Sequence, residues 1–294
     1  MGGATIIGFS AIAAWALLAL LTDLSGNVPP FQLMAMTFAI AALPGLIAMA
    51  VQPERRQALR QPGGIWLLGV GGLFGYHFCY YTALDSAPAI DASLIAYLWP
   101  LLIVLGSALL PGESLRWHHV AGALLGLCGA ALIVTKGGSF GFSAEYGFGY
   151  LMAGFCAVIW SGYSLLSRRS AAVPTDAVTG FCLVTSLLAF ACHLSFEQTA
   201  WPSTAGQWAA IGALGLVPLG LAFMAWDHGV KHGNIQTLGA ASYAAPLLST
   251  LVLIAAGRAE PAWSTLAACL LITLGACLAA KDMIFTGRAA GEGK

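Results

Sequence analysis

Long stretches without a charged side chain are the feature of this sequence that most limits what the chain can fold into. Between successive Asp, Glu, Lys and Arg residues, ten runs contain at least 19 residues, whereas every other gap contains 8 or fewer. A helix that crosses a bilayer needs roughly 20 apolar residues. Only 8% of the residues are charged, against about 25% in a typical soluble domain. We therefore expect lipid, not water, to be the solvent for most of the surface.

These runs predict an all-α polytopic membrane protein with ten transmembrane helices. Two of the runs have turn residues at one end, at 25–30 and 202–206, and trimming these leaves one helix in each run. The runs are continuously apolar and lack the period-2 alternation that a membrane β-barrel requires. The predicted helices span residues 5–23, 31–51, 64–84, 90–110, 117–135, 147–167, 177–196, 207–227, 234–256 and 263–281.

Basic residues in the predicted loops predict the orientation, because Lys and Arg are enriched on the cytoplasmic side. Lys136 and Arg258 lie on the side away from the termini. We therefore expect both termini in the cytoplasm, and the first run lacks the basic start of a cleaved signal peptide. The basic residues on the side of the termini are Arg55, Arg56, Arg60, Arg116, Arg168, Arg169, Lys231, Lys281, Arg288 and Lys294.

Several functional classes are excluded by what the sequence lacks. With 12 Lys+Arg against 12 Asp+Glu, no basic patch is present to meet nucleic-acid phosphates. The seven cysteines fall inside the predicted spans without CxxC spacing, so they are interpreted as packing residues and not as disulfides or metal ligands. No P-loop occurs, and no acid, base or nucleophile shows the mutual spacing of a catalytic centre. We expect no cofactor, no metal and no catalytic residue.

The two halves of the sequence resemble each other. Residues 97–102 and 243–248 both follow the pattern Tyr-x-x-Pro-Leu-Leu at an offset of 146, and the same offset relates Trp117 to Trp263. Five helices then fall in each half, at 1–137 and 138–294. Because five is odd, the second half must enter the membrane inverted, as in many secondary transporters.

Motifs in the first half carry a resemblance to a known family. Residues 83–94 (ALDSAPAIDASL) lead into Pro100, and residues 111–116 (PGESLR) precede the glycine pair of 122–126 (GALLG). These motifs resemble the EamA repeat of the drug/metabolite transporter superfamily, in its ten-helix form. The Tyr- and Trp-rich middle of helices 3 and 4 is most similar to the aromatic amino acid exporters of the YddG type. The resemblance implies an exporter in the bacterial inner membrane.

Ring residues near the middle of the predicted helices form the predicted substrate site. Trp and Tyr normally gather at the two membrane interfaces, and a buried hydroxyl in hydrocarbon needs a partner. We expect these rings to line a central cavity, although filling of the bundle core remains an alternative. The predicted site residues are Trp15, Tyr76, His77, Tyr80, Tyr97, Trp99, Pro100, Trp160, Tyr163, Ser242, Tyr243 and Pro246.

Pro100 and Pro246 are also the predicted hinges. Each proline removes a helical N–H and frees the carbonyl four residues earlier, at Ala96 and Ser242. In a membrane such a carbonyl is tolerated only beside a partner or water. Two matched prolines at mid-depth therefore predict a pair of bends that flank one site.

The scarcity of ionisable residues in mid-span indicates the substrate class. His77 is the one titratable group near the predicted midplane, whereas an anionic substrate would require buried Lys or Arg and a cationic drug would require a buried Glu. A neutral or zwitterionic amphipathic solute remains, which favours aromatic and other neutral amino acids carried by alternating access. Other small amphipathic metabolites or drugs are the alternative, and a membrane enzyme is a distant one. Proton coupling through His77 and facilitated diffusion both remain open.

Gly122 and Gly126 bear on the oligomeric state. Their GxxxG spacing is compatible with a dimer face, but it is more typical of packing inside one bundle. We expect a monomer whose partners are the lipid bilayer and a small-molecule substrate.

Overall fold

A computed structural model of the chain describes residues 2–138, 141 and 143–281, and these residues form helices, turns and coil without any strand. Two basic residues used for the orientation, Arg288 and Lys294, lie outside this range. The helices in chain order are α1 (Gly3–Trp15), α2 (Leu18–Leu24), α3 (Pro30–Val51), η1 (Pro53–Leu59), α4 (Gly63–Val70), η2 (Gly71–Gly75), α5 (Tyr76–Ser86), α6 (Ala89–Ala96), α7 (Trp99–Gly106), η3 (Ser107–Leu109), α8 (Trp117–Val134), η4 (Ala144–Tyr146), α9 (Gly147–Arg169), α10 (Ala177–Phe196), α11 (Ala205–Leu214), η5 (Gly215–Leu221), α12 (Ala222–His232), α13 (Ile235–Ala241), α14 (Ala244–Ala255) and α15 (Trp263–Ala279).

The helical stretches explain how the chain meets a bilayer. Within the described residues, eight of them are long and apolar enough to cross a membrane, and α15 is a shorter apolar helix. The stretch from α4 to α5 is also helical, although its second half is rich in Tyr and is not among the eight. The chain is an all-helical, multi-pass membrane protein, in agreement with the predicted fold class.

Several long helices are interrupted near their middle. The α6–α7 junction falls at Tyr97 and Leu98, and the α13–α14 junction falls at Ser242 and Tyr243. Each junction comes just before the predicted proline, which occupies the first turn of the following helix, where a missing N–H is tolerated. A third interruption separates α1 from α2 without any proline or glycine to predict it.

Two segments of π-helix lie in the stretches that pass from α4 to α5 and from α11 to α12. They are η2 and η5, and Pro218 lies inside η5. Such segments widen the helix locally and leave carbonyl groups without their usual partners. Pro218 is thus accommodated by a change in helix type, whereas Pro44 lies within the uninterrupted α3.

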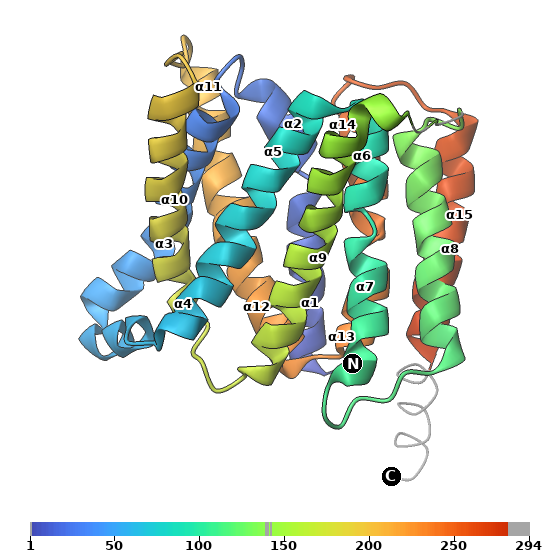
Figure 1. Cartoon of the computed structure of the whole chain (residues 1–294), viewed down its shortest axis with the longest axis horizontal. Coiled ribbons are helices and arrows are strands. Elements are labelled where there is room, and N and C mark those ends of the chain that lie inside the picture. The colour runs from blue at the N-terminus through green and yellow to red at the C-terminus, as the bar shows by residue number, and fades with distance from the viewer. Residues whose placement is uncertain (1, 139–140, 142, 282–294) are drawn as a thin grey trace.

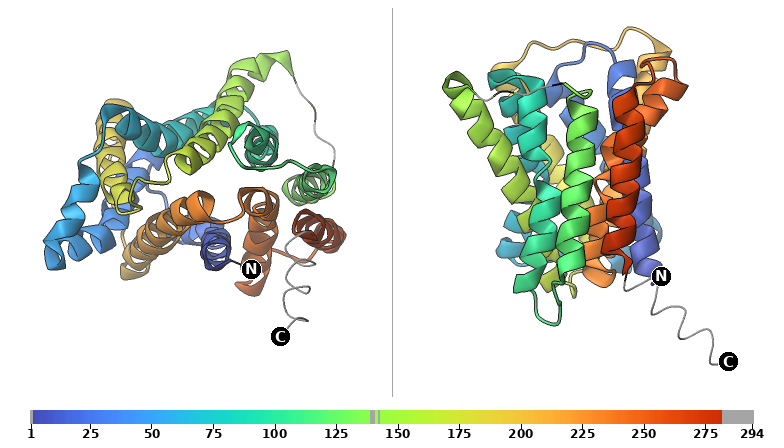
Figure 2. Two further views of the ribbon diagram at one scale, coloured as in Figure 1. Left: turned by 90° about the horizontal axis from the view of Figure 1, so that it is seen from below. Right: turned by 90° about the vertical axis from the view of Figure 1, so that its right-hand side faces the viewer.

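Packing between distant parts of the chain arranges the helices into one bundle in which the start of α1 and the end of α15 lie at the same end, the end nearer the termini (Figure 1). The most extensive contacts join α8 to α15, α3 to α10, α1 to α12 and α5 to α9. Figure 2 shows α8 and α15 side by side, at the edge of the bundle opposite α3 and α10.

Glycines bring α8 and α15 into backbone contact. A Cβ atom at Gly122 would lie 2.5 Å from the carbonyl oxygen of Gly275, and a Cβ atom at Gly126 would lie 2.6 Å from the Tyr243 ring. Small residues let membrane helices approach this closely. The GxxxG pair of α8 therefore packs inside the bundle, as the more typical interpretation of its spacing predicted.

This contact predicts that Gly122→Ala destabilises the protein. Alanine would place a methyl group against a backbone carbonyl that cannot swing away, and such overpacking costs about 1–3 kcal/mol. We expect a lower thermal unfolding temperature in detergent than for the wild type. Gly162→Ala is the matched control, because a Cβ atom there meets nothing within 4 Å. Equal melting temperatures for the two variants would contradict the packing described here.

Candidate functional site

Four tryptophans meet in the middle of the bundle and form what we call the tryptophan cluster: Trp15, Trp99, Trp160 and Trp226. The Trp15 ring centroid lies 6.3 Å from that of Trp99, 5.9 Å from that of Trp160 and 5.1 Å from that of Trp226. Edge-to-face contacts dominate, as the ring quadrupole favours. None of the four is more than 8% exposed.

The helix interruptions place two of these rings. Trp15 is the last residue of α1, and Trp99 is the first residue of α7. Each ring therefore stands where the regular backbone stops, with room for a large side chain. The other two rings lie within the uninterrupted α9 and α12.

One indole of the tryptophan cluster, that of Trp226, has a hydrogen-bond partner on α9. The Trp226 Nε1–H donates to the Ser164 Oγ at 3.1 Å, and the Ser164 hydroxyl donates to the Trp160 carbonyl at 2.9 Å. Buried indole N–H groups normally find such a partner. This chain of bonds fixes the Trp226 ring against α9.

Three tyrosines continue the ring surface from the tryptophan cluster, and we call them the tyrosine wall: Tyr76, Tyr80 and Tyr97. The rings of Tyr76 and Tyr80 are stacked with centroids 6.0 Å apart and planes within 9°. Tyr76 also lies 5.6 Å from Trp160, which joins the tyrosine wall to the tryptophan cluster. All three tyrosines are half-buried, so solvent or a ligand can reach them.

His77 stands beside the tyrosine wall among further rings. Its ring centroid lies 5.2 Å from that of Phe38 and 6.2 Å from that of Phe223. Its Nδ1 donates to the carbonyl of Leu73 at 2.7 Å, within the π-helical η2. A carbonyl can only accept, so neutral His77 carries its proton on Nδ1 and presents Nε2 as an acceptor.

The ring residues contain no carboxylate and no Lys or Arg, but Asp227 follows Trp226 directly in α12. Asp227 is 1% exposed. Its Oδ2 accepts from the Lys231 Nζ at 2.7 Å and from the Thr175 hydroxyl at 2.7 Å. The sequence placed Asp227 at a helix end, whereas α12 continues to His232 because this i,i+4 pair neutralises the charge inside the helix.

Three predicted site residues lie apart from the rings. Tyr243 is fully buried in a second cluster with Val104 and Leu247, and its hydroxyl accepts from the Leu101 N–H at 3.2 Å. Ser242 is fully buried, and its hydroxyl donates to the carbonyl of Leu238 at 2.8 Å. Like them, Pro246 is buried at the α13–α14 junction.

The remaining predicted residues fall close to the rings. The Tyr163 ring packs against that of Trp160 in a tilted arrangement with centroids 5.3 Å apart, and Tyr163 is 3% exposed. Pro100 is buried directly after Trp99. Residues that the sequence did not predict as part of the site are Phe38, Tyr81, Ser93, Phe223 and Trp226.

Packing differs between the two ends of the bundle. All seven residues of α13, near the termini, are buried. At the other end no residue of α2 is buried, and in α5 only Ala83 is. In Figure 2 the helices spread apart at the end away from the termini. The side chains of α13 are therefore buried more completely than those of α2 and α5.

The hydrogen bond from the Leu101 N–H to Tyr243 predicts that Tyr243 and Tyr97, which occupy equivalent positions in the two halves, differ in their effect on stability. Tyr243→Phe removes the acceptor of a buried backbone N–H, and leaving such a group unpaired costs about 1–3 kcal/mol. We expect a lower melting temperature for Tyr243→Phe in detergent and little change for Tyr97→Phe, because Tyr97 is half-buried. A Tyr243→Phe protein that melts like the wild type would remove this role.

Comparisons with known proteins agree with the helical architecture. The sequence profile of the EamA-like transporter family matches residues 3–135 and again residues 147–280. The aromatic amino acid exporter YddG of Ancylobacter novellus is 53% identical over 277 residues, which cover 94% of this chain and 96% of that protein. The protein of the same name from Salmonella typhimurium is 28% identical over 262 residues, 84% of this chain and 86% of that one.

A solved crystal structure has the same fold as this chain. The two chains are 52% identical and superpose with a TM-score of 0.91, over 95% of this chain and 96% of the other.

Proposed function

The chain belongs to the EamA-like transporter family, and on that premise we propose that it exports aromatic and other neutral amino acids across the bacterial inner membrane. The observation that carries the proposal is the uncharged ring surface of the tryptophan cluster and the tyrosine wall. The name of the Ancylobacter novellus relative, which is 53% identical, supports the same substrate class.

The chemistry of the ring surface suits a zwitterion with a flat side chain. Aromatic side chains of the substrate stack on rings, and an ammonium group over a ring face is stabilised by about 0.5–2 kcal/mol. The Nε2 of His77 accepts from the ammonium group, and the hydroxyls of Tyr76 and Tyr80 donate to the carboxylate. The hydroxyl oxygen of Tyr80 lies 3.3 Å from the hydroxyl oxygen of Ser93, and this hydrogen bond orients the Tyr80 side chain.

We propose that two inverted five-helix repeats, at 1–137 and 138–294, build the ten spans of the transporter. Two matches of one family profile support this division. Contacts between helices support an inverted relation. In this division α9 is the equivalent of α1 and α5 is the equivalent of α12, and α1 packs on α12 as α9 packs on α5. The helices α3 and α8 pack on their own equivalents, α10 and α15. The glycine contacts between α8 and α15 are related in the same way. Gly122 contacts Gly275, and the positions equivalent to these at the offset of 146, Ala268 and Gly129, contact each other.

Alternating access follows from this arrangement. The end of the bundle that carries the termini is tightly packed, and the excess of basic residues assigns it to the cytoplasm. The ring surface is then accessible from the outside. The interruptions before Pro100 and Pro246 act as hinges, and rotation about them opens the cytoplasmic side. The glycines of α8 are used inside the bundle and do not form a dimer face, which is compatible with the expected monomer.

The test is counterflow in liposomes that contain the purified full chain and no ATP. Preloaded unlabelled phenylalanine should drive uptake of labelled phenylalanine and tryptophan. Trp99→Ala should reduce the initial rate by about tenfold, or about 1.4 kcal/mol, and Tyr80→Phe and His77→Gln should also reduce it. Trp201→Ala is the control, because Trp201 is 68% exposed outside the bundle core.

The outcomes separate the substrate classes. Exchange of amphipathic drugs or metabolites without exchange of any amino acid would favour the alternative substrates. Normal exchange by Trp99→Ala, Tyr80→Phe and His77→Gln together would exclude the ring surface as the site.

A further inference from the structure

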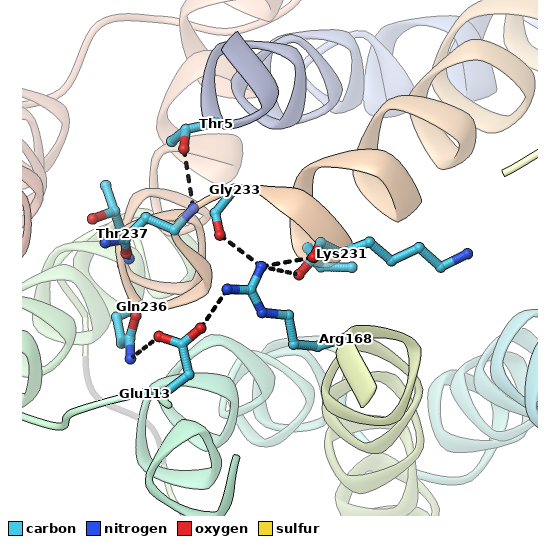
Figure 3. A network of polar contacts seen from close by, with 9 residues as sticks. Thr5, Glu113, Arg168, Lys231, Gly233, Gln236 and Thr237 are labelled. Atoms are coloured by element: carbon cyan, nitrogen blue, oxygen red, sulfur yellow. Dashed lines mark hydrogen bonds and ion pairs between the residues drawn. The ribbon is translucent and has the colours of Figure 1, made fainter. Parts of the chain in front are cut away.

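A polar network closes the bundle at the end that carries the termini. Arg168 is the penultimate residue of α9, and Glu113 lies in the turn between η3 and α8. The Arg168 Nη2 donates to the Glu113 Oε1 in an ion pair whose side chains are 25% and 15% exposed. Figure 3 shows the two side chains pointing toward each other, Arg168 from α9 and Glu113 from the turn before α8.

Arg168 also caps the end of α12. Its Nη1 donates to the carbonyl oxygens of Lys231 at 2.7 Å, Gly233 at 2.9 Å and Val230 at 3.3 Å. The last carbonyls of a helix have no partner within it and carry partial negative charge. The guanidinium group therefore binds the α12–α13 junction and Glu113 at once.

Glu113 and α1 extend the network to further segments. The second carboxylate oxygen of Glu113 accepts from the Gln236 Nε2 at 3.1 Å. The Thr5 hydroxyl oxygen accepts from the Asn234 N–H at 3.0 Å. Four segments thus meet here: the start of α1, the turn before α8, the end of α9 and the α12–α13 junction (Figure 3).

The network lies one helical turn from the tryptophan cluster. Ser164, which accepts from the Trp226 indole, is four residues before Arg168 on α9. The segments that the network joins therefore lie on the side of the tryptophan cluster that faces the termini.

An ion pair at the other end of the bundle makes a useful comparison. Asp23 at the end of α2 accepts from the Arg258 Nη1 at 2.9 Å, and both side chains are 51% exposed. Asp23 and Arg168 stand at the same offset, 145, as Trp15 and Trp160. Equivalent positions thus carry a compact, partly buried network at one end and a solvated ion pair at the other.

We propose that the network of Arg168, Glu113, Gln236 and the α12–α13 junction is a latch that keeps the cytoplasmic side closed, and that its opening is coupled to closure of the outer side. The proposal rests on the transport function proposed above. The charged groups of Arg168 and Glu113 are partly exposed. Opening of the latch therefore hydrates them, and this hydration offsets part of the ion-pair energy that is lost. The latch therefore biases the two states without fixing one permanently.

Cysteine reporters test the latch without any substrate, so an error in the substrate assignment does not affect the result. The seven native cysteines of the full chain are replaced. Ser164→Cys then reports on the space behind the latch, and Ser93→Cys reports on the outer side beside Tyr80. Labelling by a charged maleimide is followed in detergent.

Arg168→Gln and Glu113→Gln should each raise the labelling rate of Ser164→Cys about tenfold, equivalent to about 1.4 kcal/mol, and should lower that of Ser93→Cys. Arg169→Gln, an exposed neighbour, and Arg258→Gln should leave Ser164→Cys unchanged. An unchanged rate in both latch variants, or an equal rise in Arg258→Gln, would overturn the proposal. A rise at Ser164→Cys without a fall at Ser93→Cys would overturn the coupling.

Amide hydrogen exchange provides a second measurement that needs no cysteine substitution. In Arg168→Gln of the otherwise native chain, exchange should become faster in the peptide of α13 and slower around the α5–α6 junction. Identical exchange in the wild type and the variant would contradict the latch.

Discussion

Hydrocarbon offers no hydrogen-bond partner to an open peptide group and no hydration to a charge, and this constraint governs the whole structure. At two places where a helix departs from regular geometry, a side chain supplies a hydrogen-bond partner. His77 donates to the Leu73 carbonyl in η2, and the Tyr243 hydroxyl accepts from Leu101 beside the α6–α7 junction. Lys231 neutralises Asp227 within α12. The interruptions that permit bending are therefore compatible with a lipid environment, and the charges are held away from the ring surface.

The same constraint explains why rings make the proposed site. Aromatic residues offer large contact areas and polar edges without a net charge. They can therefore pack inside the membrane-embedded bundle and also contact a zwitterionic solute. The buried tryptophan cluster meets the half-buried tyrosine wall at Trp160. In the proposed function this site is closed on one side and accessible on the other, and the proposed latch of Arg168 and Glu113 lies on the closed side. Under this proposal, selectivity and access depend on different chemistry at different depths.

Much of this could be predicted from the sequence. Charge-free runs predicted the helical stretches, and Tyr76 and Tyr80, which were predicted site residues four positions apart, have stacked rings in the structure. Trp226 was missed because Asp227 was interpreted as a helix end, although its i,i+4 spacing to Lys231 was the available signal. The break between α1 and α2 has no proline or glycine to mark it in the sequence. Trp15, the last residue of α1, packs in the tryptophan cluster, and this tertiary contact is not visible in the sequence. The sequence shows Arg168 only as a basic loop residue, since the fold brings its partners together from two distant segments, the turn before α8 and the α12–α13 junction.

A structure of the protein with bound 4-bromophenylalanine tests the central claim most directly, because anomalous scattering locates the bromine without reference to any assumed pose. The account predicts one bromine peak against the ring surface, between the tyrosine wall and the tryptophan cluster, within contact of Tyr76 or Trp160. A single well-occupied peak elsewhere, on the lipid-facing surface or beyond the latch at the end with the termini, would contradict it.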